Sequence, residues 1–289
     1  MKNKENFSDY QEEGHLWITL STGDYYPDML PLASELYKPV LVIFGHLLKS
    51  SHSSTDLFMS ISEEKPQWMR IQLCRVFRKY VSPETPVEML KKKSVAKKIC
   101  EQFGIRFRNI SEVQSRFESR PMPDETLCAI LWEYKDRGRK GYNLTERLFS
   151  IMQENYSSFT ITGPERAGKF VLMGELFENY PNAERPVDFV LFHDKKPVAI
   201  GLTRYDSGRS NAQEEERIAQ YRDCANEVLT YAKDNNLNLK IIFLNDGPGL
   251  LLGSIWKDYA QIEESWNALV KVVTLRMITE RITMSWLLN

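Results

Sequence analysis

The sequence has few cysteines, no long apolar run and no excess of charge of either sign. Its four cysteines are far apart and lack any CxxC spacing, which argues against a disulfide framework or a zinc knuckle. No stretch reaches the roughly 18 apolar residues that a membrane helix needs. The polar segment Met1 to Gln11 also lacks the apolar region of a secretory signal. We therefore expect a cytoplasmic protein without a membrane segment.

The net charge also limits how the chain can bind nucleic acid. A formal net charge of -1 means that any such surface must come from local clusters of Lys and Arg. With 289 residues, of which 42% are hydrophobic and 27% charged, the composition is that of a globular protein with a sizeable core. Helical patterns dominate from Pro66 to about Tyr156, and a strand-rich region follows. We predict a mostly helical region over residues 1–155 and an α/β core with a C-terminal extension over 156–289.

The second region predicts the order helix, strand, strand, helix, strand. Helical spacing favours a first helix over Arg166 to Tyr180. Two strands are expected at Val187 to His193 and Pro197 to Thr203, and their short connection indicates an antiparallel hairpin. A second helix is expected from Gln213 to Asp234, and Leu239 to Leu244 is typical of a buried parallel strand. The order favours an α/β fold with a mixed central sheet flanked by helices.

An acidic residue stands at the start of the first strand of this hairpin. Pro186-Val187-Asp188 opens a run of otherwise apolar residues, where a carboxylate is costly to bury unless it is paired or binds a metal. Phosphodiester cleavage without a covalent intermediate needs a divalent ion that carboxylates hold. Mg²⁺ prefers oxygen ligands and needs only two or three converging carboxylates, because it keeps several waters. Asp188 is therefore the first candidate metal ligand.

The hairpin resembles the PD-(D/E)xK nucleases, in which an Asp on one strand is followed on the next by an acid, a spacer and a lysine. The resemblance covers Arg166 to Gly249 and is strongest in Arg185 to Val190 and Tyr205 to Gly208. Gly201-Leu202-Thr203 stands in the place of the (D/E)xK triplet. The resemblance implies a restriction-endonuclease-like fold and a type II restriction endonuclease that hydrolyses double-stranded DNA with Mg²⁺. It also implies a homodimer, in which two active sites meet the two strands of a symmetric site.

The second acid of the motif is expected on the following helix, as in some members of this family. Three glutamates, Glu214 to Glu216, stand about a dozen residues after the triplet. Glu214 lies four residues before Ile218 and seven before Tyr221, so on a continuous helix it shares the sheet-facing side, whereas Glu216 points away. Glu214 is favoured, and Glu216 stays an alternative because the helix begins near here.

Further residues complete the predicted active site. Thr203 stands where the lysine belongs, and the role of that cation falls to Arg204 or to another cation that the sequence does not reveal. Strand alternation turns Arg204 to the opposite face from Thr203 unless a bulge intervenes. Glu175 would assist the metal or its water. The predicted catalytic residues are Asp188, Glu214, Glu216, Thr203, Arg204 and Glu175, and the predicted Mg²⁺ ligands are Asp188, Glu214 and Glu216.

Basic and amide side chains in three segments are candidates for contact with DNA. The first segment holds Arg166 and Lys169, at the start of the helix predicted before the hairpin, and a helix N-terminus can hold a phosphate. The segment Tyr134 to Tyr142 combines cations with two glycines and predicts a loop that approaches phosphates. A third group follows the hairpin, and Arg pairs with guanine while Asn or Gln pairs with adenine. The predicted DNA-binding residues are Arg166, Lys169, Arg137, Arg139, Lys140, Arg209, Asn211 and Gln213.

Two other functions remain open at this point. One is a DNA-binding protein of the same fold with a decayed site, which the triplet Gly201-Leu202-Thr203 favours. The other is a helical interaction protein without a nucleic-acid role. Each motif also has a purely structural interpretation: Asp188 can cap a turn or pair with Arg185, and Glu214 to Glu216 can be a solvated helix start. Asp246-Gly247-Pro248-Gly249 is first of all a turn.

Overall fold

The computed structural model describes residues 4–20, 24–85, 93–164, 170–207 and 211–289, without the side chains at 93, 136–143, 211–215 and 267. The chain forms two compact units. One combines Met1–Thr22 with Gly138–Asn289, and the other is Gly23–Arg137. Their boundary lies inside one long helix, α7 (Glu125–Asn155). The division predicted between residues 155 and 156 therefore differs from the observed one, because the N-terminal segment packs with the C-terminal core.

The unit Gly23–Arg137 is helical, as the sequence predicts for the N-terminal region. Its elements are α2 (Leu30–Ser50), α3 (Ser54–Glu63), α4 (Gln67–Tyr80), η3 (Lys93–Val95), α5 (Ala96–Phe103), η4 (Gly104–Arg106), α6 (Ile110–Glu118) and the first part of α7. Aromatic rings join the helices: the ring centroids of Phe58 and Phe77 lie 5.0 Å apart, and those of Phe77 and Phe107 lie 5.1 Å apart. Among the described helices of either unit, none has the length and apolar character to cross a membrane.

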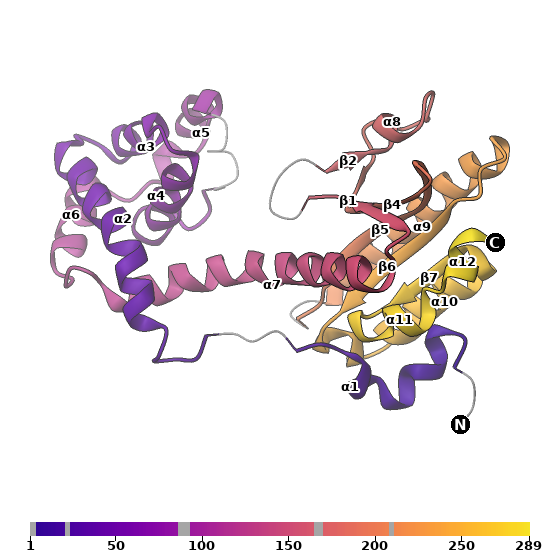
Figure 1. The fold of residues 1–289 in the computed structure, drawn as a ribbon. Helices are drawn as coiled ribbons and strands as arrows, with labels where there is room; N and C mark the ends of the chain where they lie inside the picture. The colour runs from indigo at the N-terminus through magenta and orange to yellow at the C-terminus, as the bar shows by residue number, and fades with distance from the viewer. Residues whose placement is uncertain (1–3, 21–23, 86–92, 165–169, 208–210) are drawn as a thin grey trace. The chain divides into compact units, whose positions relative to one another are not determined.

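The other unit is built on a mixed five-stranded sheet (Figure 1). Its strands are β1 (Phe159–Thr162), β4 (Phe189–His193), β5 (Lys196–Tyr205), β6 (Lys240–Asp246) and β7 (Val270–Val273), in the order β1-β4-β5-β6-β7. β4 is antiparallel to β1 and β5, whereas β6 is parallel to β5 and β7. A separate two-stranded sheet pairs β2 (Val171–Leu172) with β3 (Pro186–Val187). The predicted α/β class with a mixed sheet is confirmed.

Helices cover both faces of the five-stranded sheet. The remaining elements are η1 (Phe7–Glu13), α1 (Gly14–Trp17), α8 (Met173–Leu176), α9 (Asn211–Asp234), η5 (Pro248–Leu251), α10 (Ile255–Ser265), η6 (Asn267–Leu269), η7 (Leu275–Met277), α11 (Ile278–Arg281) and α12 (Met284–Leu288). On one face, Tyr221 of α9 stacks on Phe243 of β6, with ring centroids 4.2 Å apart. On the other, Thr145 Oγ1 of α7 lies 3.4 Å from Thr203 Oγ1 of β5. Thr203 pairs with Leu244, the neighbour of Phe243, so strand alternation places the two contacts on opposite faces.

The hairpin predicted around Asp194 is confirmed, as are the helix and the strand that follow it. β4 and β5 are antiparallel, and their connection contains Asp194 and Lys195, both with positive φ. The predicted first strand is interrupted at Asp188, which separates β3 from β4. α9 and β6 match the second predicted helix and the predicted parallel strand within a few residues.

The helix predicted over Arg166 to Tyr180 is wrong. Among its described residues, Val171–Leu172 form a strand and Met173–Leu176 form a single helical turn. Val171 pairs with Val187 of β3. This tertiary pairing holds a β-branched residue in extended backbone, which its stiff side chain favours, and it overrides the helical spacing of the apolar residues.

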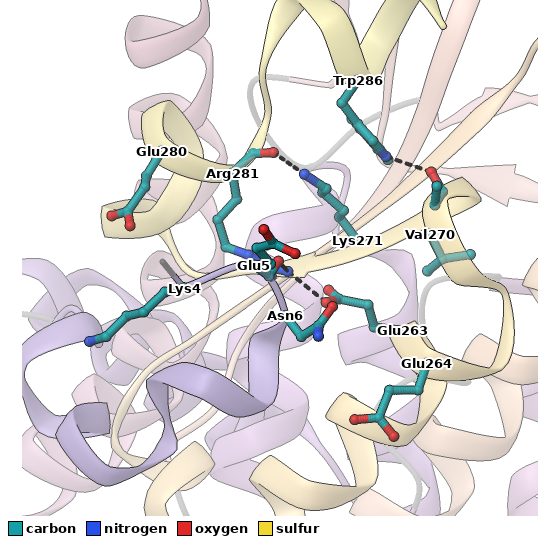
Figure 2. Close-up of a pocket in the computed structure, with 11 residues that line it drawn as sticks. Lys4, Glu5, Asn6, Glu263, Glu264, Val270, Lys271, Glu280, Arg281 and Trp286 are labelled. Atoms are coloured by element: carbon teal, nitrogen blue, oxygen red, sulfur yellow. Dashed lines mark hydrogen bonds and ion pairs between the residues drawn. The ribbon is translucent and has the colours of Figure 1, made fainter. Parts of the chain in front are cut away.

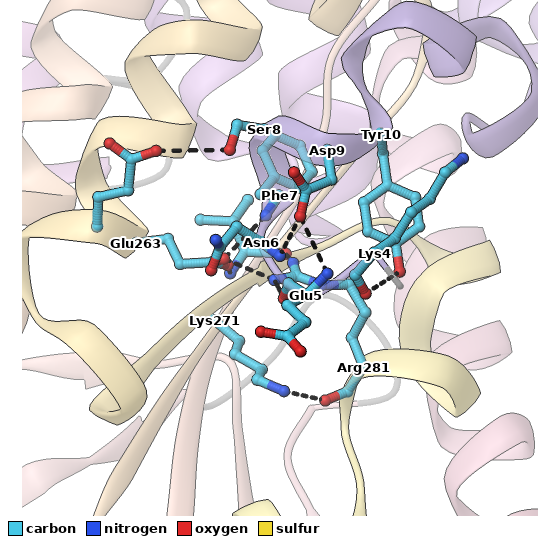
Figure 3. Close-up of polar contacts among 12 residues, drawn as sticks. Lys4, Glu5, Asn6, Phe7, Ser8, Asp9, Tyr10, Glu263, Lys271 and Arg281 are labelled. Carbon is cyan, nitrogen blue, oxygen red and sulfur yellow. Dashed lines mark hydrogen bonds and ion pairs between the residues drawn. The ribbon is translucent and has the colours of Figure 1, made fainter. Parts of the chain in front are cut away.

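A buried ion pair holds the N-terminal segment against the C-terminal elements (Figure 3). Arg281 Nη2 of α11 lies 2.6 Å from Glu263 Oε1 of α10, and the two side chains are 1% and 7% exposed. Glu263 also accepts the N–H groups of Phe7 at 2.9 Å and Val272 at 2.8 Å. Arg281 donates to the carbonyls of Val272 and Glu5. Both oxygens of the Glu263 carboxylate therefore have partners. We call Glu5, Phe7, Glu263, Val272 and Arg281 the Arg281 cluster.

Candidate functional site at the end of strands β5 and β6

Asp188 lies where the pairing between β4 and β5 ends. Its backbone N–H donates to the carbonyl of Gly201 at 2.9 Å. Its Oδ2 accepts the backbone N–H of Thr203 at 2.6 Å and the Thr203 hydroxyl at 3.3 Å. The Asp188 carboxylate thus accepts the hydrogen bond of the Thr203 N–H group, which the backbone of a longer β4 would otherwise accept. The alternative pairing with Arg185 is not found, because Arg185 contacts Glu227 of α9 at 2.5 Å.

The surroundings of Asp188 disfavour its charged form. Burial raises the pKa of Asp188, and the Thr203 hydrogen bonds and the charge of Arg204 offset this rise only in part. Hydrogen bonds and an opposite charge stabilise a carboxylate, whereas desolvation destabilises it. The pKa of Asp188 is therefore shifted, as is often found for ionisable groups at functional sites.

A row of polar side chains lies beside Asp188 on the α9 face. Arg204 of β5 pairs in register with Asn245 of β6, and Asn245 Oδ1 accepts the hydroxyl of Tyr221 at 2.9 Å. Burial raises the pKa of Tyr221 well above its ordinary value, the neighbouring Tyr259 and Asp188 add to this, and Arg204 opposes it. The charge of Arg204 acts on both Tyr221 and Asp188, whose pKa values it lowers. The side chains of Arg204 and Thr203 leave β5 on opposite sides, as strand alternation predicts.

Two nitrogen atoms in this row are buried without a partner in the part of the chain that the structure describes. Arg204 Nε and Asn245 Nδ2 are buried and have no hydrogen-bond partner among the residues that the structure describes. Buried polar groups without partners are uncommon in native proteins, and each one calls for an explanation such as a bound ligand or ion. We call Asp188, Thr203, Arg204, Tyr221 and Asn245 the Asp188 cluster.

Asp206 and Arg217 extend the Asp188 cluster beyond the end of β5. Asp206 is 4% exposed, and its Oδ2 lies 3.9 Å from Arg217 Nη1 of α9. The backbone of Asp206 donates to the carbonyl of Asp246 at 2.7 Å and accepts from Gly249 at 3.0 Å. Open α/β sheets bind ligands at the carboxyl ends of their parallel strands. This rule could have identified Asp206 and Asn245 from the sequence, because both are polar residues at the carboxyl ends of β5 and β6.

Asp246 has a structural role larger than the predicted turn. It is fully buried, and its carboxylate accepts the N–H groups of Thr19 at 2.5 Å, Gly247 at 2.7 Å and Leu275 at 3.0 Å. Burial still raises the pKa of Asp246, against the opposing effect of these donors. Gly247 has φ +111°, and a Cβ there would lie 2.3 Å from the carbonyl oxygen of Asp206. The turn therefore fixes the end of β6 next to the Asp188 cluster.

Two of the predicted acids lie away from the Asp188 cluster. Glu216 is exposed, and its Oε1 accepts a hydrogen bond from Gln220 at 3.4 Å along its own helix. Glu175 is also exposed, and its Oε2 accepts the N–H of Leu172 at 3.4 Å, so it caps the single turn of α8. Glu214 lies in α9, and its side chain is outside the described residues. Ile218 and Tyr221, which share its predicted face, are both buried.

The predicted basic loop over Tyr134 to Tyr142 is wrong, because this segment lies inside α7. Lys and Arg are good helix formers, and a glycine costs only about 1 kcal/mol inside a long helix. Gly138 and Gly141 therefore do not end it. The side chains of Arg137, Arg139, Lys140, Asn211 and Gln213 lie outside the described residues, as do Arg166, Lys169 and Arg209 entirely.

Comparison with family models, with curated proteins and with solved structures finds no match to this chain.

The donors around Asp188 have the chemistry that Mg²⁺ requires. Mg²⁺ takes oxygen ligands, often one or two carboxylates with waters. Burial raises the pKa of Asp188 despite the Thr203 hydrogen bonds and the charge of Arg204, and a bound cation would further stabilise the charged carboxylate. Within the described part of the chain, no group of three His, Cys, Asp or Glu residues could hold a metal ion. Glu214, whose side chain lies outside the described residues, has the predicted helix position for a second ligand beside Asp188.

Proposed function

We propose that the chain is a Mg²⁺-dependent endodeoxyribonuclease of the PD-(D/E)xK type, and specifically a type II restriction endonuclease acting on double-stranded DNA as a homodimer. The observation that carries the proposal is the Asp188 cluster: a carboxylate with a raised pKa directly before one hairpin strand, beside buried polar atoms that have no partner among the described residues. The alternative acid, Glu216, is exposed, so Glu214 is the preferred second ligand.

The arrangement of elements supports the restriction-endonuclease-like fold of this proposal. Helix α7 precedes an antiparallel set of strands, β1, β4 and β5, and α9 then leads to β6, which is parallel to β5. The strands and helix that the sequence predicts in the order strand, strand, helix, strand are β4, β5, α9 and β6, while α7 and β1 precede them in place of the helix expected over Arg166 to Tyr180. The Asp of the motif starts the first hairpin strand, and Gly201 to Thr203 lie opposite it on the second.

In the proposed mechanism each residue of the Asp188 cluster has a separate task. Asp188 would hold the cation, and Thr203 orients its carboxylate through the two hydrogen bonds to Oδ2. Bound Mg²⁺ would supply an activated water and Lewis acidity at the phosphate. Arg204, whose Nε has no partner among the described residues, donates to a phosphate oxygen and counters its developing charge. Arg204 thereby takes the role of the lysine that Thr203 replaces.

Cleavage of several unmethylated viral DNAs in the presence of Mg²⁺ tests the proposal. We expect discrete fragments with common end sequences, and an activity loss of at least about 100-fold in Asp188→Ala, because charge stabilisation at a reacting phosphate is worth that much. Asp223→Asn is the matched control, since Asp223 is an exposed acid on α9. Absence of cutting by the intact chain on every DNA, or cutting that survives Asp188→Ala, would contradict the proposal.

One observation favours a second function, a DNA-binding protein with the same fold and a decayed site. Thr203 replaces the lysine and gives both of its donors to Asp188 Oδ2, as expected if the carboxylate only caps the strand. This alternative predicts binding without cutting, in which the logarithm of the binding constant falls linearly with the logarithm of salt concentration, because phosphate contacts release counterions. Binding measured at several salt concentrations, with and without Mg²⁺, distinguishes the two functions.

A further inference from the structure

A pocket of about 560 Å³ lies beside the Arg281 cluster (Figure 2). Its walls come from the N-terminal segment, α10, η6, β7, α11 and α12. Small-molecule sites usually have volumes of about 300–1,000 Å³, so this pocket has a suitable size. No residue of the Asp188 cluster lines it, and a ligand bound here would be separate from the proposed nuclease site.

One of the three cations in the walls lacks an acidic partner. Lys4 Nζ lies 2.5 Å from Glu13, and Arg281 is paired with Glu263. Lys271 Nζ of β7 instead donates to the backbone carbonyl of Arg281, and no carboxylate within the described residues forms an ion pair with it. Figure 2 shows the amine of Lys271 directed at that carbonyl.

The position of Lys271 favours an uncharged amine. An ammonium group has three N–H donors, and here a single acceptor meets them. Burial and, to a smaller extent, the charge of Arg281 on α11 lower the pKa of Lys271 to about 8, against the opposing charge of Glu263 on α10. The other charged residues that line the pocket are Lys4, Glu5, Glu264 and Glu280. A larger share of this amine than of an exposed lysine is therefore nucleophilic near neutral pH.

The remaining wall residues indicate what kind of molecule the pocket accepts. Trp286 presents its ring 5.0 Å from Lys271 Nζ and offers an apolar surface. Glutamates in the walls outnumber cations, because Glu5, Glu263, Glu264 and Glu280 face Lys4, Lys271 and Arg281. An anionic ligand would be repelled.

We propose that this pocket binds a small aldehyde or ketone without an anionic group, and that Lys271 is the amine that captures it as an imine. The lone pair of Nζ attacks the carbonyl carbon to give a carbinolamine. A C=N bond then replaces the C=O bond, and the two amine hydrogens leave with the carbonyl oxygen as water. The step needs neither an oxidant nor a reductant, and hydrolysis reverses it.

Labelling of the full-length chain tests this proposal without a folding-sensitive variant. The protein is incubated at pH 7.5 with limiting benzaldehyde, or with 4-carboxybenzaldehyde as the anionic counterpart, and imines are trapped with cyanoborohydride and mapped by mass spectrometry. We expect benzaldehyde to label Lys271 roughly ten-fold faster than the exposed Lys195 and Lys257, because more of its amine is neutral. The preference should be lost with the carboxylated aldehyde.

The dependence on pH and two variants sharpen the test. The labelling rate of Lys271 should reach half of its maximum near pH 8, whereas exposed lysines should follow their ordinary pKa of about 10.4. Lys271→Arg should remove the fast-labelling site, and Lys257→Arg should leave it unchanged. Labelling of Lys271 no faster than that of Lys195, as expected if it only caps the end of α11, would overturn the proposal. A preference of Lys271 for the carboxylated aldehyde would overturn it as well.

Discussion

In the Arg281 cluster a buried cation and a buried anion lie 2.6 Å apart, and both oxygens of Glu263 have donors. In the Asp188 cluster the carboxylate has only Thr203 as a hydrogen-bond donor among the described residues, while Arg204 Nε and Asn245 Nδ2 have no partner there. Both clusters belong to the same unit and both bury charge. Arg281 Nε also lacks a partner among the described residues, so the difference between the clusters lies in charge pairing. The two charges of the first cluster form an ion pair, as in a structural contact, whereas no described cation forms one with Asp188.

This comparison predicts that the two clusters respond in opposite directions when a charge is removed. Removing one partner of a compensated buried pair leaves the other charge uncompensated and destabilises the fold. Removing a buried charge that has no ion-pair partner, such as that of Asp188, should instead raise the free energy of unfolding. The following substitutions test the contrast, in order of decreasing expected effect.

Arg281→Ala should have the largest effect, a loss of about 3–5 kcal/mol in the free energy of unfolding, because Glu263 would remain buried without its cation. Urea unfolding measures the loss. Arg276→Ala is the matched control, since Arg276 is exposed and, among the described residues, donates to the carbonyl of Leu16 alone. A loss below about 1 kcal/mol in Arg281→Ala would show that the Arg281 cluster is not the compensated pair that the comparison assumes.

Asp246→Ala should rank second, with a loss of about 2–4 kcal/mol, because three backbone N–H groups would lose their acceptor in a buried position. Asp246→Asn keeps one acceptor oxygen and should lose less. Thermal unfolding of the two variants gives the order. Equal stability of Asp246→Ala and the unaltered chain would mean that water reaches these donors.

The sequence predicts the centre of this unit better than its edges. The hairpin, α9 and β6 follow from short apolar strands, turn residues and a regular helical period. β1 and β7 were not predicted, since four-residue strands carry little pattern of their own and depend on pairing with β4 and β6. The helix expected over Arg166 to Tyr180 was wrong for the same reason, because pairing with β3 decides the conformation of Val171.

For the candidate site, the sequence identified Asp188, Thr203 and Arg204 but not Tyr221 or Asn245. Asp188 was recognisable because a carboxylate at the start of an apolar strand is unusual. Tyr221 fits the apolar period of α9, so its hydrogen bond to Asn245 could not be inferred. The contact between Arg217 and Asp206 joins residues on two elements whose register no local pattern specifies. Pairwise contacts across elements are therefore the part of the site that local sequence patterns leave open.

Tyr221→Phe should cost about 1 kcal/mol, since it removes one buried hydrogen bond and leaves Asn245 Oδ1 without its donor. The variant tests whether Asn245 is held in place for a ligand. If the Asp188 cluster binds Mg²⁺ and DNA, a misoriented Asn245 should lower cleavage more than it lowers stability. Unfolding and cleavage are measured on the same preparation, and an unchanged cleavage rate would remove Asn245 from the proposed site.

Asp188→Asn should have the smallest effect on stability and the opposite sign. The folded-state pKa of Asp188 is raised, so this group favours folding most at low pH, and that contribution is lost as pH rises through the folded-state pKa. At neutral pH the charged carboxylate is a cost, and replacing it with an amide should stabilise the chain by about 0.5–1 kcal/mol. The gain should disappear in acid, where Asp188 is itself protonated. Urea unfolding across this pH range measures it, and a destabilised Asp188→Asn at neutral pH would mean that Asp188, like Glu263, is a compensated structural charge.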